Sequence, residues 1–180
     1  MYVLLFLTVA LYLFQVQDSA KYARVFSFDR HAVASGEVWR LVTWQFTQVG
    51  HGWFEFPPIV ALLFTMLLLF MMGGAVEEEW GTRRFLTLFL ISTFASAGIA
   101  AILGVTLLGS YFINFSLLFV YASMFPQRLF RMLAVVVGIM LISVVFAGGA
   151  ANLAALAGAV ASYIYYLLQR PFIPKVVADE

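Results

Sequence analysis

The chain has 180 residues, of which 64% are hydrophobic and only 11% are charged. Soluble domains carry roughly half apolar and a quarter charged residues, so this composition excludes an ordinary soluble globular protein. A formal net charge of +1 without a basic block argues against nucleic-acid binding, and the absence of cysteine excludes disulfides, thiolate catalysis and cysteine-based zinc sites.

The charged residues are clustered, and the stretches 1–17, 57–76, 85–127 and 132–169 carry none. A helix needs about 20 apolar residues to cross a bilayer. A core helix of a soluble protein would show a polar stripe at a period of 3.6 residues, which these stretches lack. We therefore predict an all-α membrane protein, forming one domain over residues 1–180. The six predicted transmembrane helices cover residues 2–16, 58–75, 85–103, 110–125, 133–147 and 151–168.

The first predicted span, 2–16, is short and lies at the start of the sequence, so a signal peptide is the rival interpretation. The span has no basic residues before its apolar run, and Asp18-Ser19-Ala20 is a poor cleavage site. We therefore expect a retained helix.

The segment 17–56 differs from the rest because it is long and rich in aromatic residues. It contains Trp39, Trp44 and Trp53, and it also holds both histidines of the chain, His31 and His51. Aromatic side chains favour the interface between membrane and water. We predict a partly helical segment that lies on the bilayer surface.

Charged or glycine-rich turns separate the remaining spans. Residues 77–84, with the sequence EEEWGTRR, are expected to form a charged turn after the second span. With the N-terminus inside, the short inside turns carry Arg or Lys and the short outside turns carry none. The distribution of positive charge then predicts a multi-pass protein of the cell membrane, with both termini cytoplasmic and the aromatic segment outside.

The sixth span is rich in small residues at helical spacing. Ala151, Ala155 and Ala159 share one face, and Ala154, Gly158 and Ser162 share an adjacent one. Small residues at this spacing allow helix backbones to approach closely. We predict that this helix packs centrally in the bundle.

Three motifs in order resemble the rhomboid superfamily. Residues 36–47 read GEVWRLVTWQFT, residues 77–86 read EEEWGTRRFL, and residues 152–159 read NLAALAGA. The resemblance implies a six-helix rhomboid-like bundle with a long first loop, in which Trp39, Arg40, Glu77 and Gly158 are structural residues.

Active rhomboids are intramembrane serine proteases, and their catalytic positions can be placed on this chain by the resemblance. Anchoring the fourth helix on Phe125-Pro126 puts the serine position on Tyr111. The histidine of the sixth helix falls on Ala155, and the two oxyanion residues of the second helix fall on Ala61 and Thr65. All four functional residues are therefore substituted, which implies a catalytically inactive pseudoprotease. The resemblance to inactive members such as derlins implies binding of transmembrane segments of client proteins.

The residue types in the predicted spans indicate independently that no catalytic base is present there. A serine hydroxyl needs a neighbouring base to act as a nucleophile. The predicted spans contain no His, Lys, Asp or Glu, although ionisable residues are the usual mark of function inside a membrane. One alternative stays open: an atypical dyad of Ser110 with His51, both on the outer side, would make the chain an active protease.

Other polar residues suggest structural roles. Asn114 and Asn152 are expected to form hydrogen bonds between helices. Three consecutive carboxylates at 77–79 point about 100° apart on a helix, so we expect no metal site there. The resemblance to rhomboids implies that Glu77 is the one that caps or bonds a neighbouring helix. We expect no cofactor and no nucleic-acid partner, but contact with the lipid bilayer. A transporter is disfavoured because no charge lines a path and no proline breaks a span.

Overall fold

The computed structural model describes residues 2–47, 58–109, 111–125 and 150–169, and this part of the chain is helical. The longer helices, listed with their bounds, are α1 (Tyr2–Gln17), α5 (Pro58–Leu68), α6 (Gly74–Trp80), α7 (Thr82–Leu103), α8 (Tyr111–Met124) and α10 (Ala150–Gln169). A π-helical turn, η2 (Leu69–Gly73), joins α5 to α6 without a break in the helix.

Helices lie at five of the six predicted positions, because long apolar runs can satisfy their backbone groups only internally. The prediction for the second span was wrong at its end. The helix continues through Glu77–Glu79 to Trp80, and the turn is confined to Gly81, which has a φ of 81°. The predicted span 133–147 lies outside the described residues.

Two of the described helices, α7 and α10, are long and apolar enough to cross a membrane. α1 is apolar but shorter, with 16 residues. The structure thus supports a helical protein with membrane-crossing segments.

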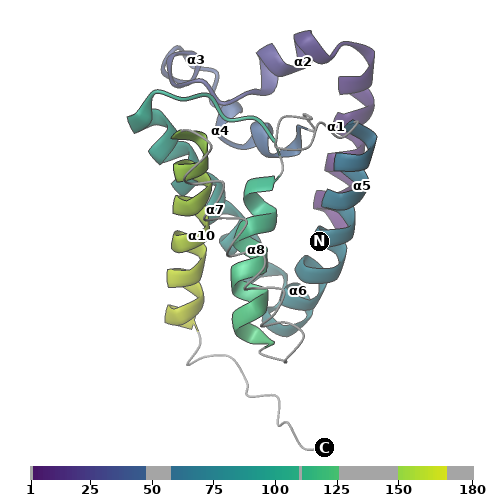
Figure 1. Ribbon diagram of the computed structural model, residues 1–180, viewed down its shortest axis with the longest axis vertical. Coiled ribbons are helices and arrows are strands. Elements are labelled where there is room, and N and C mark those ends of the chain that lie inside the picture. The colour runs from purple at the N-terminus through teal and green to yellow at the C-terminus, as the bar shows by residue number, and fades with distance from the viewer. Residues whose placement is uncertain (1, 48–57, 110, 126–149, 170–180) are drawn as a thin grey trace, which may run out of the picture.

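The segment that follows α1 is partly helical. It contains α2 (Ser19–Phe26), α3 (Arg30–Ala34), α4 (Arg40–Thr43) and the 3₁₀ turn η1 (Trp44–Phe46). In Figure 1 these short helices gather at one end of the longer helices, whereas α6 lies at the opposite end.

α10 packs against α7 and α8, as its small residues predict. The buried side chains of α10 are Ala154, Ala155, Gly158, Ala159, Ser162 and Tyr166. Both small-residue faces of the sequence prediction are therefore represented in the buried surface of this helix.

Two apolar clusters form the core. The larger one surrounds Phe85, Leu88 and Leu117 and ties α6, α7 and α8 together. The second lies beside the short helices, with Phe28 and Trp44 packed against residues of α7 and α10. This second cluster brings the first loop into contact with the helix that carries Ala155.

Candidate functional site

The second apolar cluster surrounds the position that the rhomboid resemblance gives to the catalytic histidine. Ala155 is 2% exposed and shares this cluster with Phe28, Trp44 and Leu107, while Phe115 packs against its edge. Trp44 is fully buried, and its indole nitrogen donates a hydrogen bond to the Leu41 carbonyl at 3.0 Å. Among the described residues, Ala155 is therefore buried within an apolar cluster.

The other positions of the family's apparatus lie on α5 and α8. Thr65 is buried, and the Asn114 amide nitrogen of α8 donates a long hydrogen bond to its hydroxyl at 3.5 Å. Ala61 lies one turn before Thr65 on α5, and Tyr111 is the first residue of α8. The Thr65–Asn114 contact fits the expectation that Asn114 bonds between helices.

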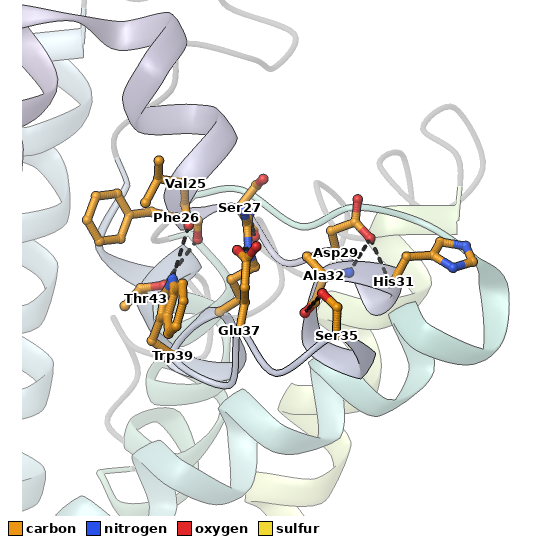
Figure 2. A network of polar contacts seen from close by, with 11 residues as sticks. Val25, Phe26, Ser27, Asp29, His31, Ala32, Ser35, Glu37, Trp39 and Thr43 are labelled. Carbon is orange, nitrogen blue, oxygen red and sulfur yellow. Dashed lines mark hydrogen bonds and ion pairs between the residues drawn. The ribbon is translucent and has the colours of Figure 1, made fainter.

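The fallback pair Ser110 and His51 lies outside the described residues. The other histidine, His31, is exposed, and its Nε2 accepts a hydrogen bond from Arg30 Nε at 3.2 Å. In Figure 2 its ring points away from the rest of the labelled loop residues.

Hydrogen bonds between uncharged side chains join the helices inside the bundle. The hydroxyls of Ser92 on α7 and Ser116 on α8 lie 2.6 Å apart, and both side chains are fully buried. Gln45 of η1 donates from its amide nitrogen to the Thr93 hydroxyl of α7 at 3.0 Å. The Gln45 and serine contacts were missed by sequence reasoning; the run of hydroxyls at Ser92, Thr93 and Ser96 was the only available signal.

The first-loop motif, residues 36–47, supplies hydrogen-bond donors to the C-terminal end of α2. The last carbonyls of a helix have no partner within the helix. Trp39 Nε1 donates to the Val25 carbonyl at 3.3 Å, and the Thr43 hydroxyl donates to the Phe26 carbonyl at 3.2 Å. Figure 2 shows these donors directed at the end of α2.

Arg40 completes this arrangement. Its Nη1 donates to the Ser27 carbonyl at 3.0 Å, and its Nε pairs with the Glu37 carboxylate at 2.6 Å. A positive charge at the C-terminal end of a helix is favourable because of the helix dipole. Among the described residues Arg40 is the only charged side chain in the buried set, and both of its contacts are made within the first loop.

Asp29 begins α3 as its N-cap. Its carboxylate accepts hydrogen bonds from the backbone amides of His31 at 2.8 Å and Ala32 at 3.3 Å. These two bonds hold the pKa of the carboxyl below its ordinary value, with smaller contributions from the nearby positive charges.

Backbone hydrogen bonds join the first loop to the connection between α7 and α8. Phe28 and Leu107 exchange both backbone bonds, at 2.9 and 3.3 Å, as an isolated antiparallel bridge. Further along, the Gly109 amide donates to the Trp44 carbonyl at 3.1 Å. The loop is thereby fixed to the residues that precede α8.

Gly158 and Glu77 also have structural contacts. A Cβ built on Gly158 would collide with the Ser96 hydroxyl and lie 2.9 Å from the Ser92 carbonyl oxygen, so only glycine allows this approach of α10 to α7. The Glu77 carboxylate accepts a hydrogen bond from the Thr82 hydroxyl at 2.7 Å, which confirms that it bonds the neighbouring helix α7. Within the described part of the chain, no three His, Cys, Asp or Glu side chains converge as they would around a metal ion.

A comparison with protein families identifies a family for most of the chain. Residues 1–123, more than half of the 180, match the model of a family described as "Eukaryotic integral membrane protein (DUF1751)". A comparison with curated proteins finds no match.

Proposed function

The chain belongs to this family of eukaryotic integral membrane proteins, and from that premise we propose that it is a rhomboid-like, multi-pass protein without a catalytic serine–histidine pair. In this proposal the bundle binds transmembrane segments of client proteins and does not cleave them. Its six spans place both termini on the cytoplasmic side of a cellular membrane.

The packing around Ala155 is the observation that carries the proposal. A general base has to come within hydrogen-bond distance of the proton that it removes, and it works best where its charged form is stabilised. Phe28, Trp44 and Leu107 occupy the space beside Ala155 with apolar groups. This environment supports an inactive bundle, because the described residues that share the cluster with Ala155 include no group that could act as a base.

The polar groups of the bundle interior support the same interpretation. The contacts Ser92–Ser116, Gln45–Thr93 and Asn114–Thr65 are formed by hydroxyls and amides alone. Such groups do not remove a proton from a serine at neutral pH. In membrane helices they act as structural links between neighbours.

The scaffold residues support the rhomboid-like part of the proposal. Each residue that the resemblance marks as structural has a defined contact: Trp39 and Arg40 at the end of α2, Glu77 with Thr82, and Gly158 against α7. The motifs thus have physical roles in a helical membrane fold, whereas the four catalytic positions hold other residues.

Client recognition would rest on lateral packing. Helices associate in a bilayer through close van der Waals contact at small residues and through hydrogen bonds between polar side chains. A client segment with small or hydroxyl residues at i, i+4 spacing matches this chemistry. By analogy with rhomboids, such a client segment would dock beside the second and fifth spans.

The proposal is tested with the full chain reconstituted in liposomes together with single-span membrane proteins that rhomboids cleave. We expect distance-dependent energy transfer between labelled chain and client, with the client intact on a gel. Competition by an unlabelled client should abolish the transfer.

A fluorophosphonate probe supplies the opposing readout. Labelling of one serine, together with client cleavage that disappears in both Ser110→Ala and His51→Ala, would overturn the proposal in favour of the atypical dyad. The absence of both transfer and cleavage would remove the client-binding part.

A further inference from the structure

The first loop carries exposed positive charges that its own carboxylates do not neutralise. Lys21, Arg24 and Arg30 are exposed, and none of them forms an ion pair within the part of the chain that the structure describes. The proposed function does not use these side chains, so a separate role for them has to be sought at the surface of the loop.

The three carboxylates between residues 18 and 47 are engaged within the loop itself. Asp18 is the N-cap of α2 and accepts a hydrogen bond from the Lys21 backbone amide at 2.9 Å. Asp29 caps α3 in the same way, and Glu37 pairs with Arg40. Because these carboxylates are directed at backbone amides and at Arg40, the exposed surface of the loop is cationic.

The helix α2 has an inward face and an exposed face. Tyr22 is buried, and its ring packs on that of Phe26 one turn later, with the ring centroids 4.4 Å apart. Lys21, Arg24 and Val25 are exposed. They stand at i, i+3 and i+4 spacing, so they share the other face. This face therefore presents two cations beside an apolar side chain.

Two exposed apolar residues before α4 extend the exposed face of α2. Trp39 Nε1 donates to the Val25 carbonyl at 3.3 Å, which holds the indole beside the end of α2 (Figure 2). Trp39 is 47% exposed and Val38 is 62% exposed. Tryptophan favours the level of the lipid headgroups, where its ring has apolar neighbours and its N–H has polar ones. We call Lys21, Arg24, Val25, Val38 and Trp39 the α2 surface.

Contacts with α7 determine the depth of the first loop in a bilayer. α7 has 22 residues, which gives about 33 Å at 1.5 Å per residue, close to the thickness of the hydrocarbon core. Arg30 Nη1 donates to the Ala101 carbonyl, two residues before α7 ends. Phe28, close to the end of α2, pairs with Leu107 beyond the end of α7. With α7 across the bilayer, the loop lies at the level of the lipid phosphates.

We propose that the α2 surface binds anionic phospholipids and enriches them beside the first loop. Lys21 and Arg24 pair with the headgroup oxygens, and Val25, Val38 and Trp39 lie against the upper part of the acyl chains. Charge complementarity selects the lipid class, because cations without a carboxylate partner attract an anionic headgroup, whereas a zwitterionic headgroup carries its own ammonium. The exposed apolar side chains favour a lipid over an acidic soluble partner, since a lipid removes them from water at the same site.

The test uses the full chain in vesicles of phosphatidylcholine and phosphatidylglycerol in equal parts, with bromine on the acyl chains of only one of the two lipids. Bromine quenches tryptophan fluorescence on contact, and subtraction of the Trp39→Phe signal isolates Trp39. We expect phosphatidylglycerol to be preferred at Trp39 roughly fivefold, the factor for one cation near a charged headgroup. Molar salt should reduce this preference, because it screens exposed charges.

Charge variants identify the side chains that bind the lipid. Lys21→Gln combined with Arg24→Gln should reduce the preference to about one, whereas Lys21→Arg combined with Arg24→Lys should keep it, because the charge remains. Arg83→Gln combined with Arg84→Gln is the matched control. It removes the same charge at the opposite end of α7 and should leave the preference at Trp39 unchanged. Circular dichroism confirms that each variant is folded.

Equal quenching by the two brominated lipids would overturn the proposal, as would a preference that molar salt leaves unchanged. Equal losses in the Lys21–Arg24 and Arg83–Arg84 double variants would also overturn it. Binding of an acidic client segment in place of lipid would appear as energy transfer that depends on Lys21 and Arg24 without any lipid preference, and it would overturn the lipid assignment. The vesicles contain no client, so these results do not depend on whether the chain is a pseudoprotease.

Discussion

At the residue scale, the donors of the first-loop motif match the unpaired carbonyls at the C-terminal end of α2. Three consecutive carbonyls, from Val25 to Ser27, would otherwise lack partners at that end. Trp39, Arg40 and Thr43 supply an indole, a guanidinium and a hydroxyl for them. The spacing of the motif follows from this geometry, because α4 and its N-cap residue Trp39 present all three donors to one helix end.

Arg40 is predicted to be the most sensitive member of the motif. Arg40→Lys keeps the charge, but one ammonium cannot occupy both the Nε and the Nη1 positions from which the guanidinium bonds Glu37 and Ser27. We expect the loop to lose about 2 kcal/mol of local stability. Hydrogen exchange should become faster at the Phe28 and Leu107 amides, which pair in the bridge.

The control for this prediction is Arg24→Lys. Arg24 is exposed and bonds the Ala20 carbonyl of its own helix. Its replacement should leave the exchange of Phe28 and Leu107 unchanged. Equally faster exchange in both variants would contradict a specific role for the guanidinium fork of Arg40, because both substitutions keep the charge.

Asp29 makes the stability of α3 depend on pH. Its pKa is lower in the folded loop than in the unfolded chain, because two backbone amides bond the carboxylate. Its contribution is therefore complete above the unfolded value of about 4 and disappears as the pH falls through the lower, folded value. Amide exchange within α3, corrected for intrinsic rates, should increase over that acidic range.

Two substitutions test the role of Asp29. Asp29→Ala should cost about 1 kcal/mol of local stability at neutral pH, the usual value of an N-cap. Asp29→Asn keeps a capping oxygen but cannot titrate, so it should remain protected and lose the acid dependence. If Asp29→Asn retained the full acid dependence, another group would be responsible.

At the element scale, the contact between α7 and α10 depends on Gly158. Gly158→Ala places a methyl group against the Ser92 backbone and the Ser96 hydroxyl, so α10 has to move away from α7. We expect a loss of about 1–3 kcal/mol in the free energy of unfolding, as for overpacked cores. Unfolding in mixed detergent micelles, followed by circular dichroism, measures the change.

Gly98→Ala is the matched control on α7. A Cβ at Gly98 meets nothing within 4 Å, so the substitution gains helix propensity without a clash. It should stabilise the protein by roughly 0.5–1 kcal/mol. Changes of the same sign in the two variants would contradict the close-approach explanation.

At the scale of the whole molecule, the absence of cysteine allows a direct test of the proposed topology. Ala34→Cys places a thiol in the first loop, and Glu78→Cys places one at the opposite end of the bundle (Figure 1). A membrane-impermeant maleimide added to sealed vesicles should label one of the two. The other should react after permeabilisation, and labelling of both in sealed vesicles would exclude a crossing between them.

The charge distribution predicts which thiol faces the cytoplasm. The turn at Arg83 and Arg84 is expected on the cytoplasmic side, and the first loop on the other. Glu78→Cys should therefore react with reagent on the cytoplasmic face. The reverse pattern would invert the orientation without changing the helix packing.

The amino-acid sequence alone determined where the described long helices lie, except for the end of the second span, and which face of the last one is buried. An uninterrupted apolar run can only form a helix in a bilayer, and small residues at i, i+4 mark a face of close approach. The same local patterns predicted the helix at Tyr2–Gln17 and the buried Ala154 and Gly158. The resemblance to rhomboids, and not these patterns, identified Trp39 and Arg40, whose partners lie close in the chain.

The tertiary structure alone decided what surrounds each candidate position. Ala155 lies among Phe28, Trp44 and Leu107, residues that are far apart in the sequence and carry no shared local pattern. The Gln45–Thr93 bond and the π-helical turn likewise depend on how distant segments pack. Periodicity reports which face of a helix is apolar, but partners across a bundle are fixed only when side-chain shapes and hydrogen bonds from several elements are satisfied together.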